Sequence, residues 1–384
     1  MIDDERPLAG YRVVELGVWV AGPAAGGILC DWGAEVIKVE PPAGDPMRAI
    51  FSLAVGATQD ANPPFDLDNR GKRSVVLDLR ADEHRDAFER LLASADVFVT
   101  NLRVDALERL GLGHGAVLER HPRLVYASVT GYGLDGPERE RAGYDVGAFY
   151  ARSGFAYTMT VGDGAPPSLR SGKGDHVTGL ATAGAVSAAL LRRERTGKGG
   201  LVETSLLRAG MYMTGWELAI ELWFGKSQAP EPRETSSTPL VNCYRDADGH
   251  WFWLIGLEAD RHLPGILAAI GRPELATDER FATARDRRIN REALIAELDD
   301  AFATRSRDEW AKEFAVHDVW WAPVQSLAEV VEDPQAIASG AFVTMASGAR
   351  SIAPPAGFGE RDVVSPPVPE LGADTDDVLR ELGL

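Results

Sequence analysis

One carboxylate in the sequence has the surroundings that a covalent catalyst needs. Asp175 lies in the segment SGKGDHVTG, among Gly172, Gly174 and Gly179, at the start of small-residue sequence that predicts a helix over 176–195. A carboxylate attacks an activated acyl group when backbone N–H groups can approach it and water is excluded. The helix N-terminus would stabilise its anion and the oxyanion that follows attack. The alternative interpretation is an ordinary N-cap, a position that favours Asp.

Two groups of basic residues could hold a phosphate-rich ligand. The first runs from Asn69 to Arg73 and continues to Arg80, and the second comprises Asn101, Leu102 and Arg103 with Arg109. Arg80 and Asn101 come just after predicted strands, at the edge where open α/β sheets bind ligands. Each charge taken alone is typical of a solvated surface, so the hypothesis rests on the shared position.

The sequence gives little support for other cofactors. GVWVAGPAAGG follows the first predicted strand, and Glu40 ends the second, but the G-x-G-x-x-G register of a dinucleotide site is absent, so we expect no NAD. The two cysteines, Cys30 and Cys243, are far apart, and the seven histidines form no paired metal pattern. We therefore expect neither a disulfide framework nor a metal.

Alternating strands and helices must position these residues. Near-continuous apolar runs separated by helical stretches predict a buried, doubly wound parallel sheet of the Rossmann-like kind. The first unit is a βαβ motif in which the strand RVVEL leads through a Gly-rich turn and a short helix to EVIKVE. The predicted strands are Arg12–Leu16, Val36–Glu40, Ser74–Leu79, Val97–Thr100, Leu124–Ser128 and Leu201–Ser205.

The length of 384 residues predicts two domains. We expect a large domain over 1–224, completed by about 336–384 returning from the C-terminus, and a small α+β domain with its linkers over 225–335. One helix over about 205–224 leads into a polar, Pro-containing linker. The small domain then starts with a hairpin that turns at Asp248-Gly249 and continues with helices to about residue 316.

The composition excludes several partners. A formal charge of −18 disfavours nucleic-acid and anionic-membrane binding, because both need a basic face. The N-terminus is acidic rather than a signal peptide, and the longest charge-free stretch, 177–191, is too short to span a bilayer. We expect a cytoplasmic protein that binds any polyanion in a local basic pocket.

Six blocks in order resemble the family III CoA-transferases, which include formyl-CoA transferase, carnitine CoA-transferase and α-methylacyl-CoA racemase. The blocks are PLAGYRVVELGVWVAGP, GAEVIKVEPPAGDPMR, NRGKRSVVLDLR, ADVFVTNLRVDALERLGLG, HPRLVYASVTGYGLDGP with RAGYDVGAFYARSG, and GDHVTG with RRERTGKGGLVETSLL. The resemblance implies an interlocked homodimer that binds coenzyme A as acyl-CoA and passes it to a carboxylic acid acceptor.

The resemblance also implies roles for single residues. The family's nucleophile falls on Asp175, which would form an aspartyl mixed anhydride and then an aspartyl-CoA thioester. Its CoA contacts fall on Val20, Ala21, Leu77, Arg80, Asn101, Leu102, Arg103, Arg109, Arg141, Gly143 and Tyr144.

Departures from the family pattern narrow the interpretation. Pro41 and Ala142 stand where the oxalate enzyme has cationic CoA contacts, so phosphate binding must differ in detail. The glycine-run loop of the oxalate enzymes is also missing. Racemases have a His–Asp pair where this chain has Tyr144-Asp145, and racemisation needs two acid/base groups. A racemase or isomerase, and a non-catalytic acyl-CoA-binding protein, remain the alternatives.

Overall fold

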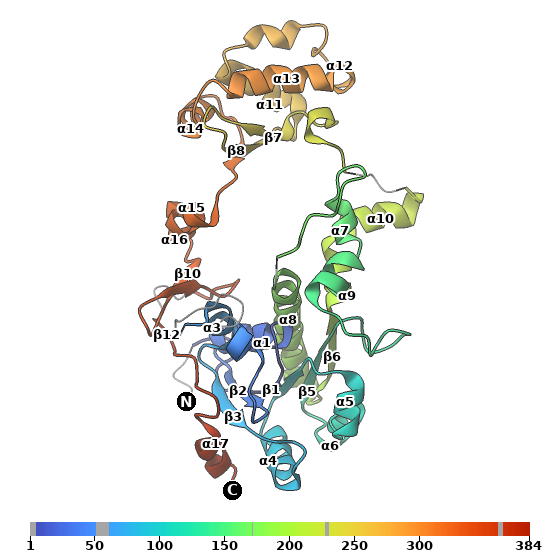
Figure 1. The fold of residues 1–384 in the computed structure, drawn as a ribbon, viewed down its shortest axis with the longest axis vertical. Helices are drawn as coiled ribbons and strands as arrows, with labels where there is room; N and C mark the ends of the chain where they lie inside the picture. Colours follow the sequence, from blue (N-terminus) through green and yellow to red (C-terminus); the bar gives the residue numbers. More distant parts are fainter. Residues whose placement is uncertain (1–4, 51–60, 171, 227–229, 360–363) are drawn as a thin grey trace. The chain divides into compact units, whose positions relative to one another are not determined.

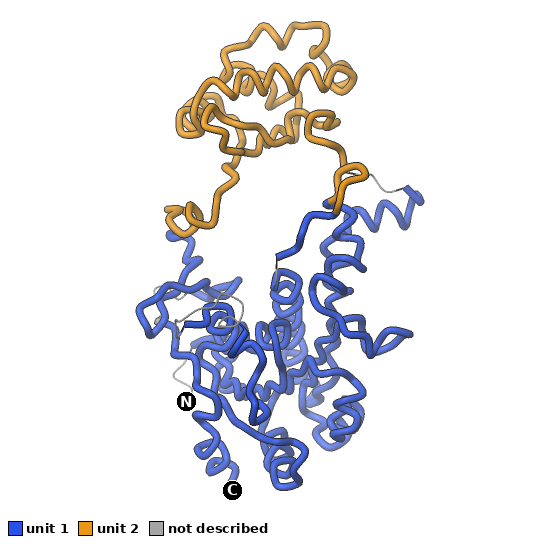
Figure 2. Tube along the Cα trace, viewed as in Figure 1, with its two compact units in different colours: residues 1–159, 166–227, 337–384 blue, residues 160–165, 228–336 orange. Residues whose placement is uncertain are grey.

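The structure is a computed structural model that describes residues 5–50, 61–170, 172–226, 230–359 and 364–384. It divides into two compact units (Figure 2). Unit 1 comprises residues 1–159, 166–227 and 337–384, and unit 2 comprises residues 160–165 and 228–336. The chain therefore leaves unit 1 and returns to it before its C-terminus.

Unit 1 is built on a six-stranded, all-parallel sheet with the order β3-β2-β1-β4-β5-β6 (Figure 1). The order reverses between β1 and β4, which creates the switch point where doubly wound sheets bind ligands. The sheet confirms the predicted fold class, and all six predicted strands are present. The strands are β1 Arg12–Leu16, β2 Glu35–Glu40, β3 Arg73–Val76, β4 Val97–Thr100, β5 Val125–Thr130 and β6 Gly200–Ser205.

Helices cover both faces of this sheet, because side chains of each strand alternate between the faces. Val14 faces a core that includes Phe88, Phe98 and Tyr126. The neighbouring Val13 faces the opposite core. The first core takes side chains from α4 Asp82–Ala93, α5 Val104–Arg109, α6 His114–Arg120 and α17 Thr375–Glu381. The second takes side chains from α1 Ala21–Asp31 and α8 Lys173–Thr196.

A set of shorter helices surrounds the start of α8. They include η1, a π-helix, which shares a small core with α7 and α9 that contains Phe149, Tyr150, Ala156 and Leu206. These elements are α3 Pro63–Asn69, η1 Asp145–Ala151, α7 Phe155–Thr158, α9 Leu206–Met213 and α10 Gly215–Phe224.

The single helix predicted over 205–224 is wrong, because Thr214 interrupts it. Thr214 has φ −96° and ψ 21°, outside the helical region, and separates α9 from α10. Its buried hydroxyl lies within hydrogen-bond distance of the carbonyl oxygens of Ser153 and Gly210. A local polar contact of this kind competes with helix continuation, which hydrophobic spacing does not reveal.

The C-terminal segment packs on the edge of the large sheet. Asp374 accepts a hydrogen bond from the backbone N–H of Ser74 at 2.8 Å, and Thr375 accepts one from Val76 at 3.1 Å. Before α17 the chain forms a second, three-stranded sheet from β10 Phe342–Met345, β11 Arg350–Ile352 and β12 Val364–Ser365, which follow α16 Pro334–Ala338.

Unit 2 is an antiparallel three-stranded sheet packed with helices around an aromatic core. The predicted hairpin is present, with the turn between β7 and β8 at residues 246–250. The core contains Tyr244, Phe252, Phe302, Trp310 and Phe314. The elements are η2 Arg233–Thr235, β7 Val241–Arg245, β8 Trp251–Ile255, α11 Ala259–Ala269, η3 Pro273–Thr277, α12 Ala284–Ile289, α13 Arg291–Phe302, α14 Arg307–Val316, β9 Trp321–Pro323 and α15 Leu327–Glu332.

Among the described residues, no helix combines the length and the apolar character that crossing a membrane requires.

Candidate active site

Asp175 lies in the first turn of α8, but it is not the N-cap. The N-cap is Gly172, whose φ of 83° favours glycine, so Asp175 is the third residue of the helix. The N-cap interpretation of Asp175 is therefore wrong. Gly174 brings this turn against the Phe149 ring, where an added Cβ would lie 2.5 Å from a ring carbon. The carboxylate is thus fixed near backbone N–H groups that have no partner within the helix.

A second carboxylate, Asp145, begins the π-helix η1 that packs on this turn. Asp145 is 8% exposed, and its Oδ1 accepts the backbone N–H of Val146 at 2.7 Å. Its Oδ2 is buried without a hydrogen-bond donor from the described residues. A buried carboxylate oxygen without a donor is costly to the fold, and π-helical turns are frequent at functional sites.

An aspartate and a histidine form an ion pair beside Asp175. His176 Nε2 lies 3.1 Å from Asp68 Oδ1, and Asp68 is buried at the end of α3. The Asp68 hydrogen bond raises the pKa of His176, and the Gly172 carbonyl adds to that effect. The imidazolium form is therefore favoured next to the candidate nucleophile.

The charge state of Asp175 results from these neighbours. Burial raises its pKa to about 7, the Asp145 and Asp68 carboxylates add to that rise, and His176 opposes it. No described residue lowers the pKa of Asp175 by donating a hydrogen bond to its carboxylate. A carboxylate that no donor stabilises, and that titrates near neutral pH, is suited to nucleophilic or acid/base chemistry.

The loop after β1 meets the end of β4 at the switch point of the sheet. Asn101 accepts the backbone N–H of Val18 at 2.9 Å and donates to the Val18 carbonyl at 2.7 Å. Trp19 has a φ of 65°, which is strained for a bulky residue, and its N–H donates to Asp45. The predicted contacts Val20 and Ala21 follow as the N-cap and first residue of α1.

The Trp19 side chain meets Tyr144 edge to face, with ring centroids 6.0 Å apart. Tyr144 is 60% exposed and directly precedes Asp145. The structure therefore brings together Val20, Ala21, Asn101 and Tyr144 at one edge of the sheet.

The other candidate CoA contacts lie along loops at that edge. The Leu77 side chain is buried in the core, so only its backbone is available to a ligand. Arg80 is exposed, and its guanidinium donates two hydrogen bonds to the Asp78 carboxylate. Leu102 is half-buried, and Gly143 packs so closely on Tyr132 that an added Cβ would lie 2.9 Å from its ring.

Three exposed arginines complete the set. Arg103 is the N-cap of α5 and Arg109 is its last residue. Arg141 pairs with Glu138 at 2.7 Å. Pro41 and Ala142, which depart from the family pattern, are also exposed.

Most of the basic side chains in the first group predicted from the sequence form ion pairs that stabilise the fold. Arg70 is buried and pairs with Asp31 at 2.6 Å, and Lys72 is buried and pairs with Glu15 at 2.6 Å. Arg73 pairs with both Glu35 and Glu381. The hypothesis that these three side chains bind phosphate is wrong for this conformation, because each of them already forms an ion pair with a carboxylate.

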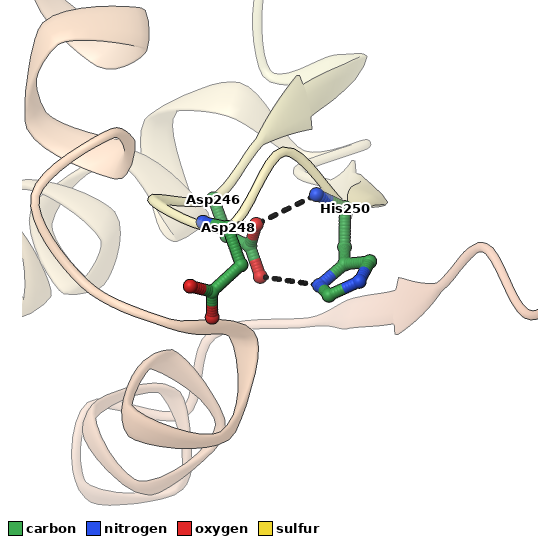
Figure 3. Close-up of side chains that lie close together, drawn as sticks. All are labelled: Asp246, Asp248 and His250. Atoms are coloured by element: carbon green, nitrogen blue, oxygen red, sulfur yellow. Dashed lines mark hydrogen bonds and ion pairs between the residues drawn. The ribbon is translucent and has the colours of Figure 1, made fainter.

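One group in unit 2 has the composition of a metal site, and Figure 3 shows Asp246, Asp248 and His250 together in the β7–β8 turn. The Asp246 carboxylate, however, accepts backbone N–H groups from Asp248, His250 and Arg307. These hydrogen bonds account for the buried carboxylate as a turn-stabilising group.

Sequence reasoning did not assign roles to Asp68, Asp145 and His176. Asp68 and His176 are 108 residues apart, so no local spacing indicates their contact. Two signals were present in the sequence: His176 directly follows Asp175, and Asp145 matches the aspartate of the racemases' His–Asp pair.

Comparison with known proteins agrees with this doubly wound fold. The family model for CoA-transferase family III matches residues 8–375. The chain is 32% identical over 383 residues to (R)-2-hydroxy-4-methylpentanoate CoA-transferase of Clostridioides difficile, covering 98% of this chain and 95% of the relative. It is 31% identical over 399 residues to cinnamoyl-CoA:phenyllactate CoA-transferase of Clostridium sporogenes, covering 100% and 95%.

A solved structure agrees as well. A CaiB/BaiF family protein from Brucella suis superposes with a TM-score of 0.86 at 32% identity, covering 99% of this chain and 100% of that protein. The chain belongs to CoA-transferase family III. It is therefore an enzyme of the CoA-transferase class, whose substrates are CoA thioesters and carboxylic acids.

Proposed function

We propose that this enzyme transfers CoA between carboxylic acids through covalent intermediates on Asp175. The observation that carries the proposal is the Asp175 carboxylate itself, which is held in the first turn of α8 and has a pKa raised to about 7 by burial. At neutral pH a substantial fraction is ionised, yet no described donor quenches its nucleophilicity.

The steps balance without a metal or a redox partner. An Asp175 oxygen attacks the thioester carbonyl, the C–S bond breaks, and CoA leaves as the thiolate, which gives a mixed anhydride. The thiolate then attacks the Asp175 carbonyl and releases the donor acid as its carboxylate, which leaves an aspartyl-CoA thioester. The acceptor carboxylate reverses both steps, forming its own anhydride and then its CoA thioester, and Asp175 is regenerated.

The start of α8 supports the negative charge that develops in each step. The first N–H groups of a helix have no intrahelical acceptor, and they carry the positive end of the helix dipole. A tetrahedral oxyanion formed at Asp175 is within the first turn and is stabilised there.

CoA is proposed to lie along the sheet edge, over the loops that carry the candidate contacts. Arg103 and Arg109 are exposed at the two ends of α5, where neither has an ion pair with a described residue, and they suit the phosphates. In this proposal, the path of CoA from these arginines to the start of α8 is lined by Val20, Ala21, Asn101 and Tyr144. Substitution of Arg103 or Arg109 by Ala is expected to raise KM for acyl-CoA more than it lowers kcat.

We also propose a homodimer in which a second copy covers α10. This helix has no buried residue, and Trp216, Leu222 and Trp223 are each more than 80% exposed. Contiguous apolar surface of this kind is rare on monomers. Sedimentation of the protein should give the mass of two chains, and the Trp216→Glu/Trp223→Glu variant should shift toward one.

The experiment that tests the catalytic proposal is covalent trapping. The protein is incubated with a panel of acyl-CoAs, treated with hydroxylamine or borohydride, digested and mapped by mass spectrometry. Because two relatives are named for hydroxy acids, the panel includes CoA thioesters of 2-hydroxy acids with branched aliphatic and aromatic side chains.

Modification at Asp175, absent in Asp175→Asn, is the expected result. No labelling with any donor, together with exchange of the substrate α-proton into deuterated water, would instead support a racemase or isomerase. Binding of acyl-CoA with neither labelling nor exchange would support the non-catalytic alternative.

A further inference from the structure

We propose that Asp145 and the Asp68–His176 ion pair set the charge state of Asp175 between them, the buried aspartate opposing ionisation and the imidazolium favouring it. The inference rests on the proposed role of Asp175 as nucleophile and assigns positioning roles to three further residues. They act through Asp175 rather than on the substrate.

The geometry of Asp145 supports the opposing role. It starts η1, and Phe149 four residues later packs on Gly174, directly before Asp175. The Asp145 Oδ2 is buried without a described donor, so its charge is poorly screened toward its neighbours. A like charge near a carboxylate disfavours ionisation of that carboxylate.

The geometry of the Asp68–His176 pair supports the favouring role. His176 follows Asp175 in the helix, and its Nε2 is fixed at 3.1 Å from Asp68. Asp68 itself cannot move easily, because α1 packs so closely that a Cβ on Gly27 would lie 2.6 Å from the Asp68 carbonyl oxygen. Asp68 therefore holds the His176 imidazole at a fixed place beside Asp175, and the hydrogen bond between them favours the imidazolium form by raising the pKa of His176.

The helices that pack near Asp175 carry few other charged residues. α1 carries a single charged residue, Asp31, at its far end, where it pairs with Arg70. η1 carries Asp145 alone, and the one charged residue of α9 is the exposed Arg208. The remaining charged residues on α3 and α8 are Asp66, the exposed Lys173 and, at the far end of α8, residues 192–195.

The two roles predict opposite changes in the pH profile. Attack requires ionised Asp175, so kcat/KM rises with pH through the pKa of that carboxyl, which burial raises to about 7. Asp145→Asn removes the like charge and should move the midpoint of this rise to lower pH. His176→Gln removes the positive charge and should move it to higher pH. A midpoint change of about one pH unit is ordinary for such neighbours.

The expected rates follow from those midpoints. With a change of about one pH unit, Asp145→Asn gains about fivefold in kcat/KM at pH 6 relative to its own plateau. His176→Gln loses about fivefold at pH 7 and recovers near pH 9. His176→Arg keeps the positive charge and should not move the midpoint upward. The matched control is His121→Gln, which breaks a similar pair with Glu89 (2.8 Å) away from the site and should leave the profile unchanged.

The profile is measured twice, by turnover and by the initial rate of acyl labelling at Asp175 in the intact protein, with one acyl-CoA throughout so that substrate ionisation cancels. Opposite movements in both readouts support the inference. Midpoints that stay in place, or that move in the same direction, overturn it while leaving the nucleophile intact. Activity and labelling that persist in Asp175→Asn overturn the proposed function instead. If Asp145→Asn does not fold, Asp145→Ser carries the same prediction.

Discussion

Unit 1 contains two sets of buried or half-buried carboxylates that differ in whether they have hydrogen-bond and ion-pair partners. Beneath the first loop, Glu15 and Asp45 are fully buried and bind two buried lysines, Lys38 and Lys72, at 2.6–3.0 Å. At the start of α8, by contrast, one oxygen of Asp145 has no described hydrogen-bond donor. No described residue lowers the pKa of Asp175 through a hydrogen bond either. We call the first set the paired network and the second the site carboxylates.

The pKa values follow the same division. Burial alone would raise the pKa of Glu15, but Lys72 and Lys38 together lower it. For Asp175 burial raises the pKa, the neighbouring carboxylates add to the rise, and His176 does not cancel it. The fold thus pairs the carboxylates that hold the first loop in place and leaves those at the candidate site without a cationic partner that lowers their pKa below the usual range.

The largest effect expected is loss of activity from the site carboxylates. Asp175→Asn keeps the shape of the side chain but removes the proposed nucleophile, so kcat/KM should fall by about 10³-fold or more. Steady-state turnover with the best labelling acyl-CoA measures this, and circular dichroism confirms the fold. A variant that retains more than a tenth of the activity would mean that catalysis does not pass through this residue.

The paired network should respond in the opposite way, through stability. Glu15→Gln removes the carboxylate that pairs with Lys72 and leaves this buried ammonium with neutral acceptors such as the Pro23 carbonyl and the Asn69 side chain. Breaking one partner of a buried pair costs roughly 3–5 kcal/mol. Denaturant unfolding measures the loss.

The matched control removes the stranded charge as well. Glu15→Gln/Lys72→Met retains the pair of Lys38 with Asp45 at 2.9 Å and should recover most of the lost stability. A double variant no more stable than the single one would show that shape rather than charge balance decides this region.

Much of the scaffold, but little of this charge arrangement, could be predicted from the sequence. The six strands were predicted close to their observed bounds because short, near-continuous apolar runs such as VFVT, separated by helical stretches, are typical of a buried parallel sheet. The small-residue helix predicted over 176–195 is present within α8, and its close packing on α1 is such that an added Cβ on Gly179 would lie 2.8 Å from Ala24.

The charges could not be predicted because their roles depend on tertiary partners. Lys72 and Arg70 look like phosphate ligands in sequence, yet each binds a carboxylate from a distant element. His176 meets Asp68 across 108 residues. Local sequence identifies which residues can ionise, whereas the fold decides which of them are paired.

A third prediction concerns stability against pH at the site carboxylates. The pKa of Asp175 is about 7 in the folded protein and about 3.9 in an unfolded chain, so the folded state binds more protons between these values. Stability therefore falls as pH rises from about 4 to about 7. Asp175→Asn should be more stable than the parent by about 2 kcal/mol at pH 8, after a discount for partial exposure, and equal to it at pH 4. Equal stability at both pH values would contradict the cost assigned to this carboxylate.

The smallest effect is expected at an exposed pair that resembles the buried one. His121 contacts Glu89 at 2.8 Å, and Glu89, which also binds Arg120, is 40% exposed. Arg120 and then His121 lower the pKa of Glu89 against the effect of burial, so its contribution to stability is lost as pH falls through that lowered value. Exposed ion pairs contribute at most about 1 kcal/mol. Glu89→Gln should thus change the free energy of unfolding at pH 7 by no more than that, and by less at high salt, while turnover stays the same. Asp68→Asn should instead alter turnover, because its partner His176 neighbours the proposed nucleophile.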